Sequence, residues 1–403
     1  MFLNDLGFQY GAGIAQARQI QSLLLGGHTV GAICGANGEV GDRILFSRPG
    51  LDKGWRGIRT LDSLFASDDL LQHELIDGIL MAAAEFYPDI VVVGNLHSTS
   101  WPLQIVEELT CLGCKVVAYM HDLHLVTGRC TYPGNCDRYL SGCDQNCPTA
   151  EEYPSLAPDR IAGAWKLRRE LFNGSNSVKL AANSEYVRKL ASHAFPNGNV
   201  VTVYYGADET VFQPVNRLAA RNQLGLASDV PTVLVGAVNL RETRKGASHI
   251  ASLVERFQEG VQFISFGHPS PDLPTVRALG YHTDAKQLAR IYSSADLFVS
   301  AATEEAFGQV ILEASLCATP VVAFAAGGIP EIIQNGESGL LVPVGNTNEI
   351  GNAVELLLHK PKLREEMGHA ARELCVKRFS LKQQLTAWTG LLTQLCIETH
   401  ADL

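Results

Sequence analysis

Residues 295–314 read ADLFVSAATEEAFGQVILEA, a short apolar run, then small and acidic residues, then a second apolar stretch at helical spacing. The first run is typical of a buried strand and the second of a helix. Glu305 and Glu313 stand eight residues apart, one on the connecting loop and one in the helix. A helix start with small residues offers backbone N–H groups to a phosphate, and a carboxylate beside it suits sugar hydroxyls. Taken alone, however, such a glutamate pair is more often a solvated surface.

The strand-then-helix pattern recurs along nearly the whole chain and predicts an α/β fold, with parallel sheets covered by helices. Two sets of five strands predict two doubly wound, Rossmann-like domains. Ligands of such sheets bind beyond the carboxyl ends of the strands, so functional residues should follow strands. The strand candidates are 28–35, 89–96, 115–121, 178–183 and 200–205, then 231–238, 261–267, 295–301, 320–325 and 339–343; helical spacing appears at 14–25, 70–86, 103–112, 160–173, 247–258, 284–294, 308–317 and 361–377.

Length and composition agree with two domains. The 403 residues exceed the roughly 100 to 200 usual for one domain, and 46% of them are hydrophobic. The stretch 206–230 is polar and lacks strand periodicity. We therefore expect a first domain over 1–209, a second over 210–380, and a last helix over 381–403 that packs back on the first domain.

The charge balance argues against a nucleic-acid binder. The chain has 32 basic and 42 acidic residues, a formal net charge of −10, which lacks the basic excess that phosphate backbones require. There is no leader-like apolar run near the start and no stretch of ~18 apolar residues. The sequence predicts a cytoplasmic protein.

The segment 304–343, EEAFGQVILEASLCATPVVAFAAGGIPEIIQNGESGLLVP, resembles the signature of glycosyltransferase family 4. That family has the GT-B fold, two Rossmann-like domains with a ligand cleft between them, and consists of retaining enzymes that use nucleotide-diphosphate sugars. The similarity covers most of the chain. It implies that the first domain binds the acceptor and the second the nucleotide sugar. It also implies that Glu305 contacts hydroxyls of the donor sugar, that Glu313 holds the ribose, and that the backbone of Phe307, Gly308 and Gln309 faces the sugar and diphosphate.

Positive charge follows the first strand of the second domain in GAVNLRETRKG, residues 236–246. The family resemblance implies that Lys245 and Arg244 grip the diphosphate, where preorganised cations stabilise the charge that builds on the leaving group. This sequence departs from the family pattern at Ala237, which occupies the usual arginine position. A solvated basic loop is the alternative.

Two features of the first domain carry weaker signals. Gly11 and Gly13 lie just before a predicted amphipathic helix, and glycine lets a backbone approach a ligand closely; the resemblance implies a loop against the donor diphosphate. His121 ends a strand, and the resemblance implies a contact with the donor sugar, although a structural histidine is as good an interpretation. Asn95 and His97 follow another strand and are candidates for acceptor binding.

Four cysteines, Cys130, Cys136, Cys143 and Cys147, stand in a glycine-rich segment with spacing C-x5-C-x6-C-x3-C. Disulfides are disfavoured in a reducing cytosol, and a thioredoxin-like centre needs C-x-x-C. A structural zinc ion would order such a loop; unmetallated thiols and an iron–sulfur cluster are the alternatives. The segment, within 128–148, also resembles an insertion in a subset of family 4 enzymes of bacterial surface-polysaccharide synthesis. We expect the metal to shape the acceptor pocket without taking part in the chemistry.

Together these features predict a retaining hexosyltransferase of polysaccharide or glycoconjugate synthesis. It would move sugar from a UDP- or GDP-type donor to a glycan, lipid-linked or small-molecule acceptor, with no catalytic metal. A nucleotide-sugar epimerase, a glycosyl phosphorylase and a non-catalytic nucleotide-sugar sensor are the alternatives. The basic cluster WKLRREL, 165–171, could give weak peripheral contact with the inner face of the membrane, but a solvated helix face is the favoured interpretation.

Overall fold

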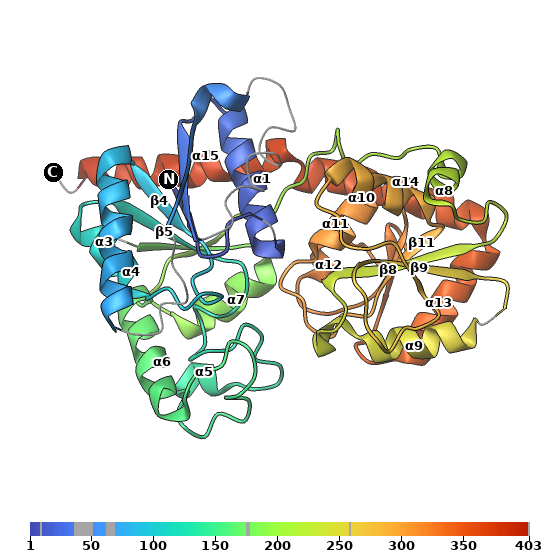
Figure 1. Cartoon of the computed structure of the whole chain (residues 1–403), viewed down its shortest axis with the longest axis horizontal. Helices are drawn as coiled ribbons and strands as arrows, with labels where there is room; N and C mark the ends of the chain where they lie inside the picture. Colours follow the sequence, from blue (N-terminus) through green and yellow to red (C-terminus); the bar gives the residue numbers. More distant parts are fainter. Residues whose placement is uncertain (9, 36–50, 62–68, 175–177, 258, 402–403) are drawn as a thin grey trace. The chain divides into compact units, whose positions relative to one another are not determined.

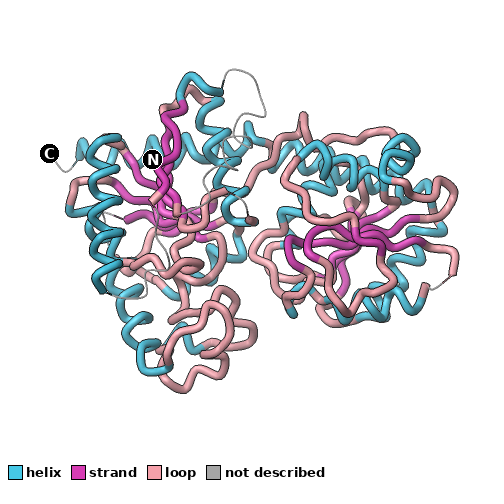
Figure 2. The backbone as a smooth tube through the Cα atoms, in the orientation of Figure 1, coloured by secondary structure: helices cyan, strands magenta, loops and turns pink. Residues whose placement is uncertain are grey.

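The computed structural model describes residues 1–8, 10–35, 51–61, 69–174, 178–257 and 259–401. The chain divides into two compact units, which are described separately here (Figure 1). Unit 1 comprises Met1–Tyr205 and Gln384–Leu403, and unit 2 comprises Gly206–Gln383. Each unit contains one sheet whose strands run parallel, with helices around it (Figure 2).

The sheet of unit 1 has, in the described residues, the strand order β3-β2-β1-β4-β5-β6-β7. The short strand β1 lies in the middle, where Leu3 pairs with Ile33 on one side and Val93 on the other. All the described pairings are parallel, so every strand ends at the same edge of the sheet. The strands are β1 (Phe2–Asn4), β2 (Val30–Cys34), β3 (Trp55–Thr60), β4 (Ile90–Val93), β5 (Lys115–Met120), β6 (Val178–Ala182) and β7 (Val200–Thr202).

The helices of unit 1 connect these strands and begin and end for local reasons. The side chain of Ser184 accepts a hydrogen bond from Val187 N–H and so caps α7, while Pro158 occupies the first position of α6, where its missing N–H leaves no bond unmade. The helical segments are α1 (Gly11–Leu25), η2 (Leu51–Gly54), α3 (Asp69–Phe86), α4 (Gln104–Cys111), α5 (Arg138–Ser141), α6 (Pro158–Phe172) and α7 (Glu185–Ala194).

The last helix, α15 (Leu381–Ala401), contributes its residues from Gln384 onward to unit 1. Its Trp388 is fully buried and meets Phe2 edge to face, with ring centroids 6.1 Å apart, and stacks on Tyr119 at 5.8 Å. Lys115 Nζ also donates to the carbonyl of Leu395 at 2.7 Å. Residues far apart in the sequence thus complete one core.

The sheet of unit 2 has the order β10-β9-β8-β11-β12-β13 in the described residues. Helices α10, α11 and α14 lie on one side of it and α9 and α13 on the other (Figure 1). Side chains cap several of these helices, as where Asp284 accepts from Lys286 N–H and Asn346 from Glu349 N–H. The elements are α8 (Arg217–Leu224), β8 (Thr232–Asn239), η3 (Thr243–Lys245), α9 (Ala247–Arg256), β9 (Gln262–His268), β10 (Arg277–Ala278), α10 (Ala285–Ser294), β11 (Leu297–Ser300), α11 (Gln309–Leu316), β12 (Val321–Phe324), α12 (Ile329–Ile332), β13 (Gly339–Val342), α13 (Thr347–His359) and α14 (Pro361–Phe379).

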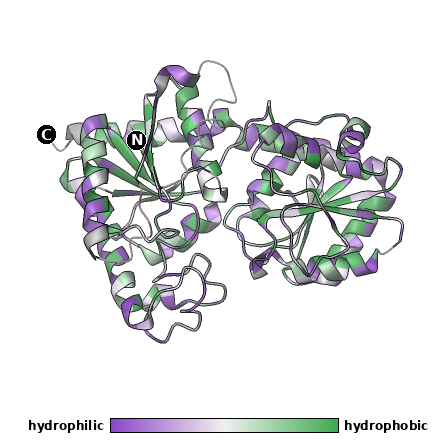
Figure 3. Ribbon diagram, in the orientation of Figure 1, coloured by the Kyte–Doolittle hydropathy of each residue, from purple (hydrophilic) through white to green (hydrophobic). Residues whose placement is uncertain are grey.

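Both cores are built from strands that are apolar on both faces, as the hydropathy colouring shows (Figure 3). In unit 2, Val233, Val235, Leu297 and Val299 are at most 1% exposed, because helices cover both sides of a parallel sheet. This burial explains why continuous apolar runs, rather than alternating ones, mark these strands in the sequence.

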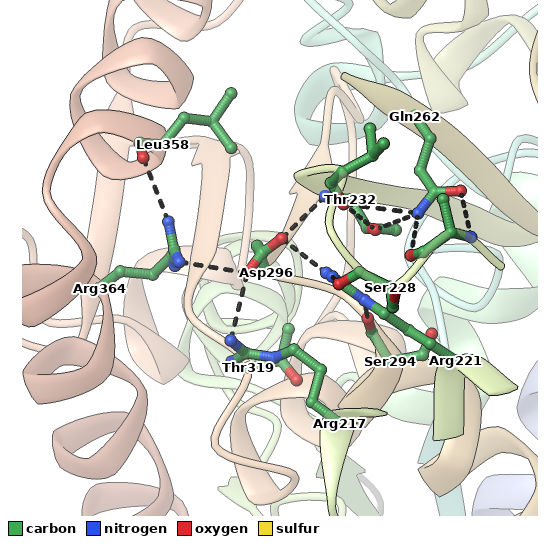
Figure 4. Close-up of polar contacts among 12 residues, drawn as sticks. Arg217, Arg221, Ser228, Thr232, Gln262, Ser294, Asp296, Thr319, Leu358 and Arg364 are labelled. Atoms are coloured by element: carbon green, nitrogen blue, oxygen red, sulfur yellow. Dashed lines mark hydrogen bonds and ion pairs between the residues drawn. The ribbon is translucent and has the colours of Figure 1, made fainter. Parts of the chain in front are cut away.

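One charged group is embedded in this core. Asp296, at the start of β11, is 5% exposed and accepts from Arg221 at 2.7 Å and from the backbone N–H of Thr232 at 2.8 Å (Figure 4). Its other oxygen meets Arg217 at 3.2 Å and Arg364 at 3.1 Å. The carboxylate therefore ties α8, β8 and α14 to β11.

The predicted fold is confirmed: each unit is a doubly wound α/β structure with a parallel sheet. Three strands were missed, β1, β3 and β10. β1 and β10 have three and two residues, too few for a periodicity to appear. The units meet in sequence at 205/206 and 383/384, beside the sequence-based boundaries at 209/210 and 380/381.

Removing the Asp296 carboxylate should destabilise unit 2 strongly. Asp296→Ala leaves the buried guanidinium of Arg221 without its counter-charge, and breaking a buried ion pair in this way costs about 3–5 kcal/mol. Urea unfolding followed by circular dichroism measures the loss. As the matched control, Arg217→Ala removes a partner that is 44% exposed and should cost at most about 1 kcal/mol. Equal losses for the two variants would contradict this ranking.

Candidate functional site

The loop that follows β8 lies against the end of β11. The backbone N–H of Thr303 donates to the carbonyl of Arg244 at 2.8 Å. Gly246 has a φ of 73°, and a Cβ there would lie 2.0 Å from the carbonyl oxygen of Ala301. Only glycine permits this approach. The close packing fixes Arg244 and Lys245 beside the residues that follow β11.

Three of the four predicted catalytic residues are brought together here. Lys245 Nζ lies 2.7 Å from Glu305 Oε2, and the guanidinium of Arg244 lies 3.9 Å from the same oxygen. Burial raises the pKa of the Glu305 carboxyl, but Lys245 and Arg244 outweigh it and hold the pKa below its ordinary value. Glu305 is therefore ionised at neutral pH and pairs chiefly with Lys245, while Arg244 is closer to Glu242, at 2.6 Å.

Ala237, which stands where the family usually has an arginine, lies inside the sheet. Ala237 is buried within β8, 4% exposed, so its position offers no cation to the edge of the sheet. Arg241, farther along the loop, donates its Nε–H to the carbonyl of Pro269 at 3.1 Å. Of the three cations in this loop, Arg244 and Lys245 are the ones that face Glu305.

Helix α11 begins beside Glu305. Gly308 precedes it with a φ of 110°, and the N–H groups of Ile311 and Leu312 donate to its carbonyl. Phe307 is buried against Phe379, with ring centroids 5.5 Å apart, and its backbone N–H donates to the Glu305 carboxylate. The positive end of a helix is a favourable place for negative charge. In this arrangement the backbone N–H of Phe307 stabilises the ionised carboxylate of Glu305.

Glu313 lies on the buried side of α11 and is 5% exposed. Its Oε2 accepts a hydrogen bond from the hydroxyl of Tyr292 at 2.8 Å. Tyr292, on α10, is fully buried and was not predicted. A tyrosine within an amphipathic helix gives no signal in sequence beyond a core position. The predicted placement of the two glutamates, one on the loop and one in the helix, is what the structure has.

In unit 1, the predicted glycine loop is instead the first turn of α1. The helix begins at Gly11 and contains Gly13. A Cβ on Gly13 would lie 2.1 Å from the carbonyl oxygen of Gly7. Gly13 therefore lets the helix start pack directly on the segment that follows β1, a reason that does not require a ligand.

His121 follows β5, as predicted, and is 6% exposed. Its Nδ1 lies 2.5 Å from the hydroxyl of Tyr205, and its Nε2 has no hydrogen-bond partner among the described residues. Burial lowers the pKa of His121 to about 4, so the ring is neutral at pH 7. His121 belongs to unit 1, whereas the Glu305 group belongs to unit 2.

A second histidine cluster lies beside it. His97 Nε2 is 3.1 Å from Asp122 Oδ2, and the His97 ring stands 4.5 Å from that of His124. Burial lowers the pKa of His97, but the attraction of Asp122 prevails and the pKa is raised. The predicted acceptor residues Asn95 and His97 line a small cavity with His121, Asp122 and His124. His124 was not predicted as part of this site, because a histidine three residues after His121 forms no sequence pattern that marks a binding residue.

A buried arginine, Arg129, holds the two ends of the cysteine-rich segment together. Arg129 is 2% exposed and donates to the carbonyls of Glu152 and Pro154 at 2.6 Å and to the hydroxyl of Thr149 at 2.8 Å. It thereby closes the segment into one loop. Such a buried guanidinium with several carbonyl partners is a strong local organiser.

The four cysteines lie in this loop as free thiols. Burial raises the pKa of Cys143 to about 11, and Cys130, Cys136 and Cys147 add to the effect, so the four groups sense one another. Within the described ranges, however, no three or more His, Cys, Asp and Glu side chains are placed so that they could hold a metal ion. The donor set suits zinc, which binds thiolates, but the arrangement as it stands is not a coordination site.

Two arginines of the basic cluster at 165–171 donate hydrogen bonds to residues in and just before the cysteine-rich loop. Arg168 is 8% exposed and donates to the carbonyl and to Nε2 of His124 at 3.0 and 2.7 Å. Arg169 donates to the carbonyl of Tyr139 and lies over the ring of Trp165 at 4.8 Å. These two guanidinium groups are engaged within the unit, whereas Lys166 and Glu170 of the same cluster are exposed to solvent. Contact of the cluster with a membrane stays a prediction.

The segment that carries this geometry is similar to known proteins. Residues 273–374, which contain Glu305, α11 and Glu313, match the family model described as Glycosyl transferases group 1. The chain is 27% identical over 214 residues to N-acetyl-alpha-D-glucosaminyl L-malate synthase of Bacillus anthracis, covering 51% of this chain and 56% of that protein. It is 32% identical over 217 residues to alpha-maltose-1-phosphate synthase of Mycolicibacterium smegmatis, covering 47% and 53%. The chain thus spans about half the length of these curated relatives.

Solved structures share the fold over nearly the whole chain. Anabaena HepE in complex with UDP and glucose has a TM-score of 0.72 at 18% identity, covering 97% of this chain and 98% of that one. Sucrose-phosphate synthase from Thermosynechococcus elongatus has a TM-score of 0.75 at 20% identity, covering 98% and 99%. Separately, none of the described helices has the length and apolar character needed to cross a membrane.

The ion pair of Glu305 should make stability depend on pH. Because the pKa of Glu305 is lowered on folding, its contribution is present above the ordinary carboxyl value of 4.5 and is lost as the pH falls through the folded value. At pH 7, Glu305→Gln should cost about 1.5–3 kcal/mol, typical of hydrogen bonds to charged groups, and the difference from the wild type should shrink as the pH falls below 4.5. Urea unfolding at each pH measures it.

Glu242→Gln is the control, since Glu242 meets Arg244 with a side chain that is 39% exposed. This variant should differ from the wild type by at most about 1 kcal/mol at either pH. A Glu305→Gln difference that stays constant from pH 7 to pH 3 would show that the ion pair is not what stabilises this loop.

Proposed function

We propose that this chain is a retaining glycosyltransferase that moves a sugar from a nucleotide-diphosphate sugar to an acceptor hydroxyl, in polysaccharide or glycoconjugate synthesis. The observation that carries the proposal is the group formed by Arg244, Lys245 and Glu305 at the carboxyl edge of a doubly wound sheet, beside the start of α11. Ligands of such sheets bind at this edge. The match of residues 273–374 to Glycosyl transferases group 1 supports it.

The charges of this group suit a leaving diphosphate. Lys245 and Arg244 are held on a rigid loop, and Lys245 is only 14% exposed as a side chain. Cations fixed in advance in a poorly solvated place stabilise the negative charge that develops when the bond between sugar and phosphate breaks. Glu305 and Glu242 offset the charges of Lys245 and Arg244 before the donor binds. The oxygens of Glu305 accept hydrogen bonds from hydroxyls of the donor sugar.

The retaining course needs no protein nucleophile in this proposal. The acceptor hydroxyl attacks the anomeric carbon on the face from which the diphosphate leaves, and an oxygen of the leaving phosphate takes the hydroxyl proton. The protein's part is to orient the groups and exclude water. Neutral His121 contributes as a hydrogen-bonding group, since burial keeps its pKa at about 4.

Glu313 holds the ribose of the nucleotide in this proposal. The hydroxyl of Tyr292 fixes one carboxylate oxygen at 2.8 Å, which orients the group for a bidentate contact with two neighbouring hydroxyls. The structure of HepE contains UDP and glucose, so UDP-sugars are the first donors to test. The acceptor is a glycan, a lipid-linked sugar or a small molecule with a free hydroxyl.

A donor panel tests the proposal. The purified chain is mixed with UDP-, GDP-, ADP- and dTDP-sugars, and the unfolding temperature and release of free nucleotide diphosphate are measured. One nucleotide class should stabilise the protein, by about 2.7 kcal/mol at a concentration 100 times the Kd. Glu313→Gln should weaken that binding at least about tenfold, because a hydrogen bond to a charged group is worth about 1.5–3 kcal/mol.

Glu337→Gln, on an exposed loop of the same unit, is the matched control and should bind as the wild type does. Stabilisation by no donor would refute the proposal. Donor binding without any release of nucleotide, in the presence of mixed glycan acceptors, would favour a sensor that binds a nucleotide sugar and turns nothing over.

We further propose a structural zinc ion on Cys130, Cys136, Cys143 and Cys147, with no part in the chemistry. Four thiols in one loop that influence one another's ionisation support it; zinc binding would have to draw them closer and release their protons.

Metal analysis of the purified protein should find about one zinc per chain. The double variant Cys136→Ser with Cys143→Ser should lose it and lose acceptor affinity while donor binding survives. Cys111→Ser, a change at an exposed thiol outside the loop, should alter neither. Absence of zinc from the wild type refutes the metal site.

A further inference from the structure

Tyr153 is an exposed aromatic side chain that is held in place from two directions. It is 64% exposed. The buried guanidinium of Arg129 donates to the carbonyls of the residues on either side of it, Glu152 and Pro154, at 2.6 Å each. The hydroxyl of Tyr153 donates to Oγ of Ser98 at 3.1 Å. Fixing an exposed side chain costs conformational entropy and gains little burial, so these contacts require an explanation.

A buried pair of side chains lies behind this hydroxyl. Nδ1 of His97 lies 3.3 Å from the hydroxyl oxygen of Tyr153, and the two rings meet edge to face. On the other side of the imidazole, Nε2 of His97 lies 3.1 Å from Oδ2 of Asp122. The side chains of His97 and Asp122 are 6% and 12% exposed. The exposed phenol is thus the outer end of a chain of polar contacts that reaches into unit 1.

This chain of contacts has a direction. Burial raises the pKa of Asp122, but the attraction of His97 outweighs it and the pKa is lowered. The carboxylate is therefore ionised and can only accept, so Nε2 of His97 carries a proton. Burial lowers the pKa of His97, but Asp122 raises it more, which favours a second proton on Nδ1. Nδ1–H then donates to the oxygen of Tyr153, whose own hydroxyl proton points outward to Ser98.

The arrangement lies at the edge of the sheet where ligands of doubly wound folds bind. His97 and Ser98 follow β4, and Asp122 follows β5. By contrast, Tyr87 is 91% exposed and precedes β4, so it lies at the opposite edge. Tyr153 therefore presents its ring and its oriented hydroxyl on the side of unit 1 that suits a ligand.

The chemistry of this group fits a sugar. A pyranose ring has a face of C–H groups and a rim of hydroxyls. A tyrosine ring packs against the apolar face, while its hydroxyl and that of Ser98 exchange hydrogen bonds with the rim. A buried ion pair adds little stability of its own. The pair of His97 and Asp122 is accounted for by the orientation that it gives to the phenol.

We propose that Tyr153 is a specificity residue for the acceptor sugar: its ring stacks on the C–H face of that sugar, and its hydroxyl, with that of Ser98, binds a hydroxyl of the rim. His97 and Asp122 are positioning residues that act through the hydroxyl of Tyr153. This inference rests on the proposed function and narrows its acceptor to a molecule that ends in a sugar ring.

Saturation-transfer NMR on the full chain, with and without UDP, measures the binding of the methyl glycosides of glucose, mannose, galactose and N-acetylglucosamine. At least one should bind to the wild type, with the strongest transfer to the C–H protons of one ring face. Tyr153→Phe removes only the hydroxyl and should weaken this binding about two- to tenfold. Tyr153→Ala also removes the ring and should weaken it at least about tenfold. Tyr87→Ala, the matched loss of an exposed tyrosine, should bind as the wild type does.

A double variant tests the positioning role. Asp122→Asn keeps a carbonyl for the backbone N–H of His124, which Asp122 binds at 2.8 Å, but removes the charge that holds His97. It should weaken glycoside binding about as much as Tyr153→Phe does. Combining the two changes should weaken binding no further, because both act on one hydroxyl. Losses that multiply in the double variant would make Asp122 structural and overturn its positioning role.

The donor panel separates this inference from the proposed function. A wild type that no nucleotide sugar stabilises refutes the proposed function, and the glycosides then judge Tyr153 alone. A wild type that binds none of the glycosides overturns the inference, whether or not a donor binds. Wild-type glycoside binding by Tyr153→Ala overturns it as well. Both Tyr153 variants change an exposed side chain, so equal unfolding temperatures are expected and folding does not confuse the result.

Discussion

The parallel direction of the strands is the constraint on which both units depend. Each sheet needs helices to return the chain to its starting edge, so all strands end on one side and the loops after them collect there. Side chains as distant in sequence as Lys245 and Glu305 meet because β8 and β11 are neighbours that end together. Asp5, Gly94 and His121 meet in unit 1 for the same reason, at the ends of β1, β4 and β5.

The two edges handle buried polar groups in opposite ways. In unit 2, Lys245 pairs with Glu305, Arg244 pairs with Glu242, and Tyr292 donates to Glu313, so these charged side chains have partners in the unliganded chain. In unit 1, Asp5, Gln16 and His121 each retain an atom without a partner among the described residues. The charged groups of the first edge are paired within the unit, whereas buried atoms of the second have no hydrogen-bond partner among the described residues. Burying a polar atom without a partner costs free energy, so the two edges differ in their electrostatic cost.

Much of this could be predicted from the sequence, because apolar runs and helical spacing report directly on burial. The strands β8, β11 and β12 and the Glu305–Glu313 arrangement were predicted on those grounds. The sequence could not show that α1 begins at Gly11, since Gly13 is required by a contact with Gly7 that only the folded chain contains. Nor could it show that Arg168 and Arg169 turn inward: a basic run is the same string of letters whether it faces water or the carbonyls of a neighbouring loop. Pairings such as Tyr292 with Glu313 are equally invisible before the helices are packed.

The burial of Trp388 against Phe2 and Tyr119 has an optical consequence. The chain contains four tryptophans, Trp55, Trp101, Trp165 and Trp388, and all of them belong to unit 1. Intrinsic tryptophan emission therefore reports on the sheet of unit 1 and on the docking of α15, while unit 2 contributes only tyrosine and phenylalanine. Tryptophan emission therefore follows the melting of unit 1 alone, and its difference from the melting seen by the backbone ellipticity of the whole chain reports on unit 2.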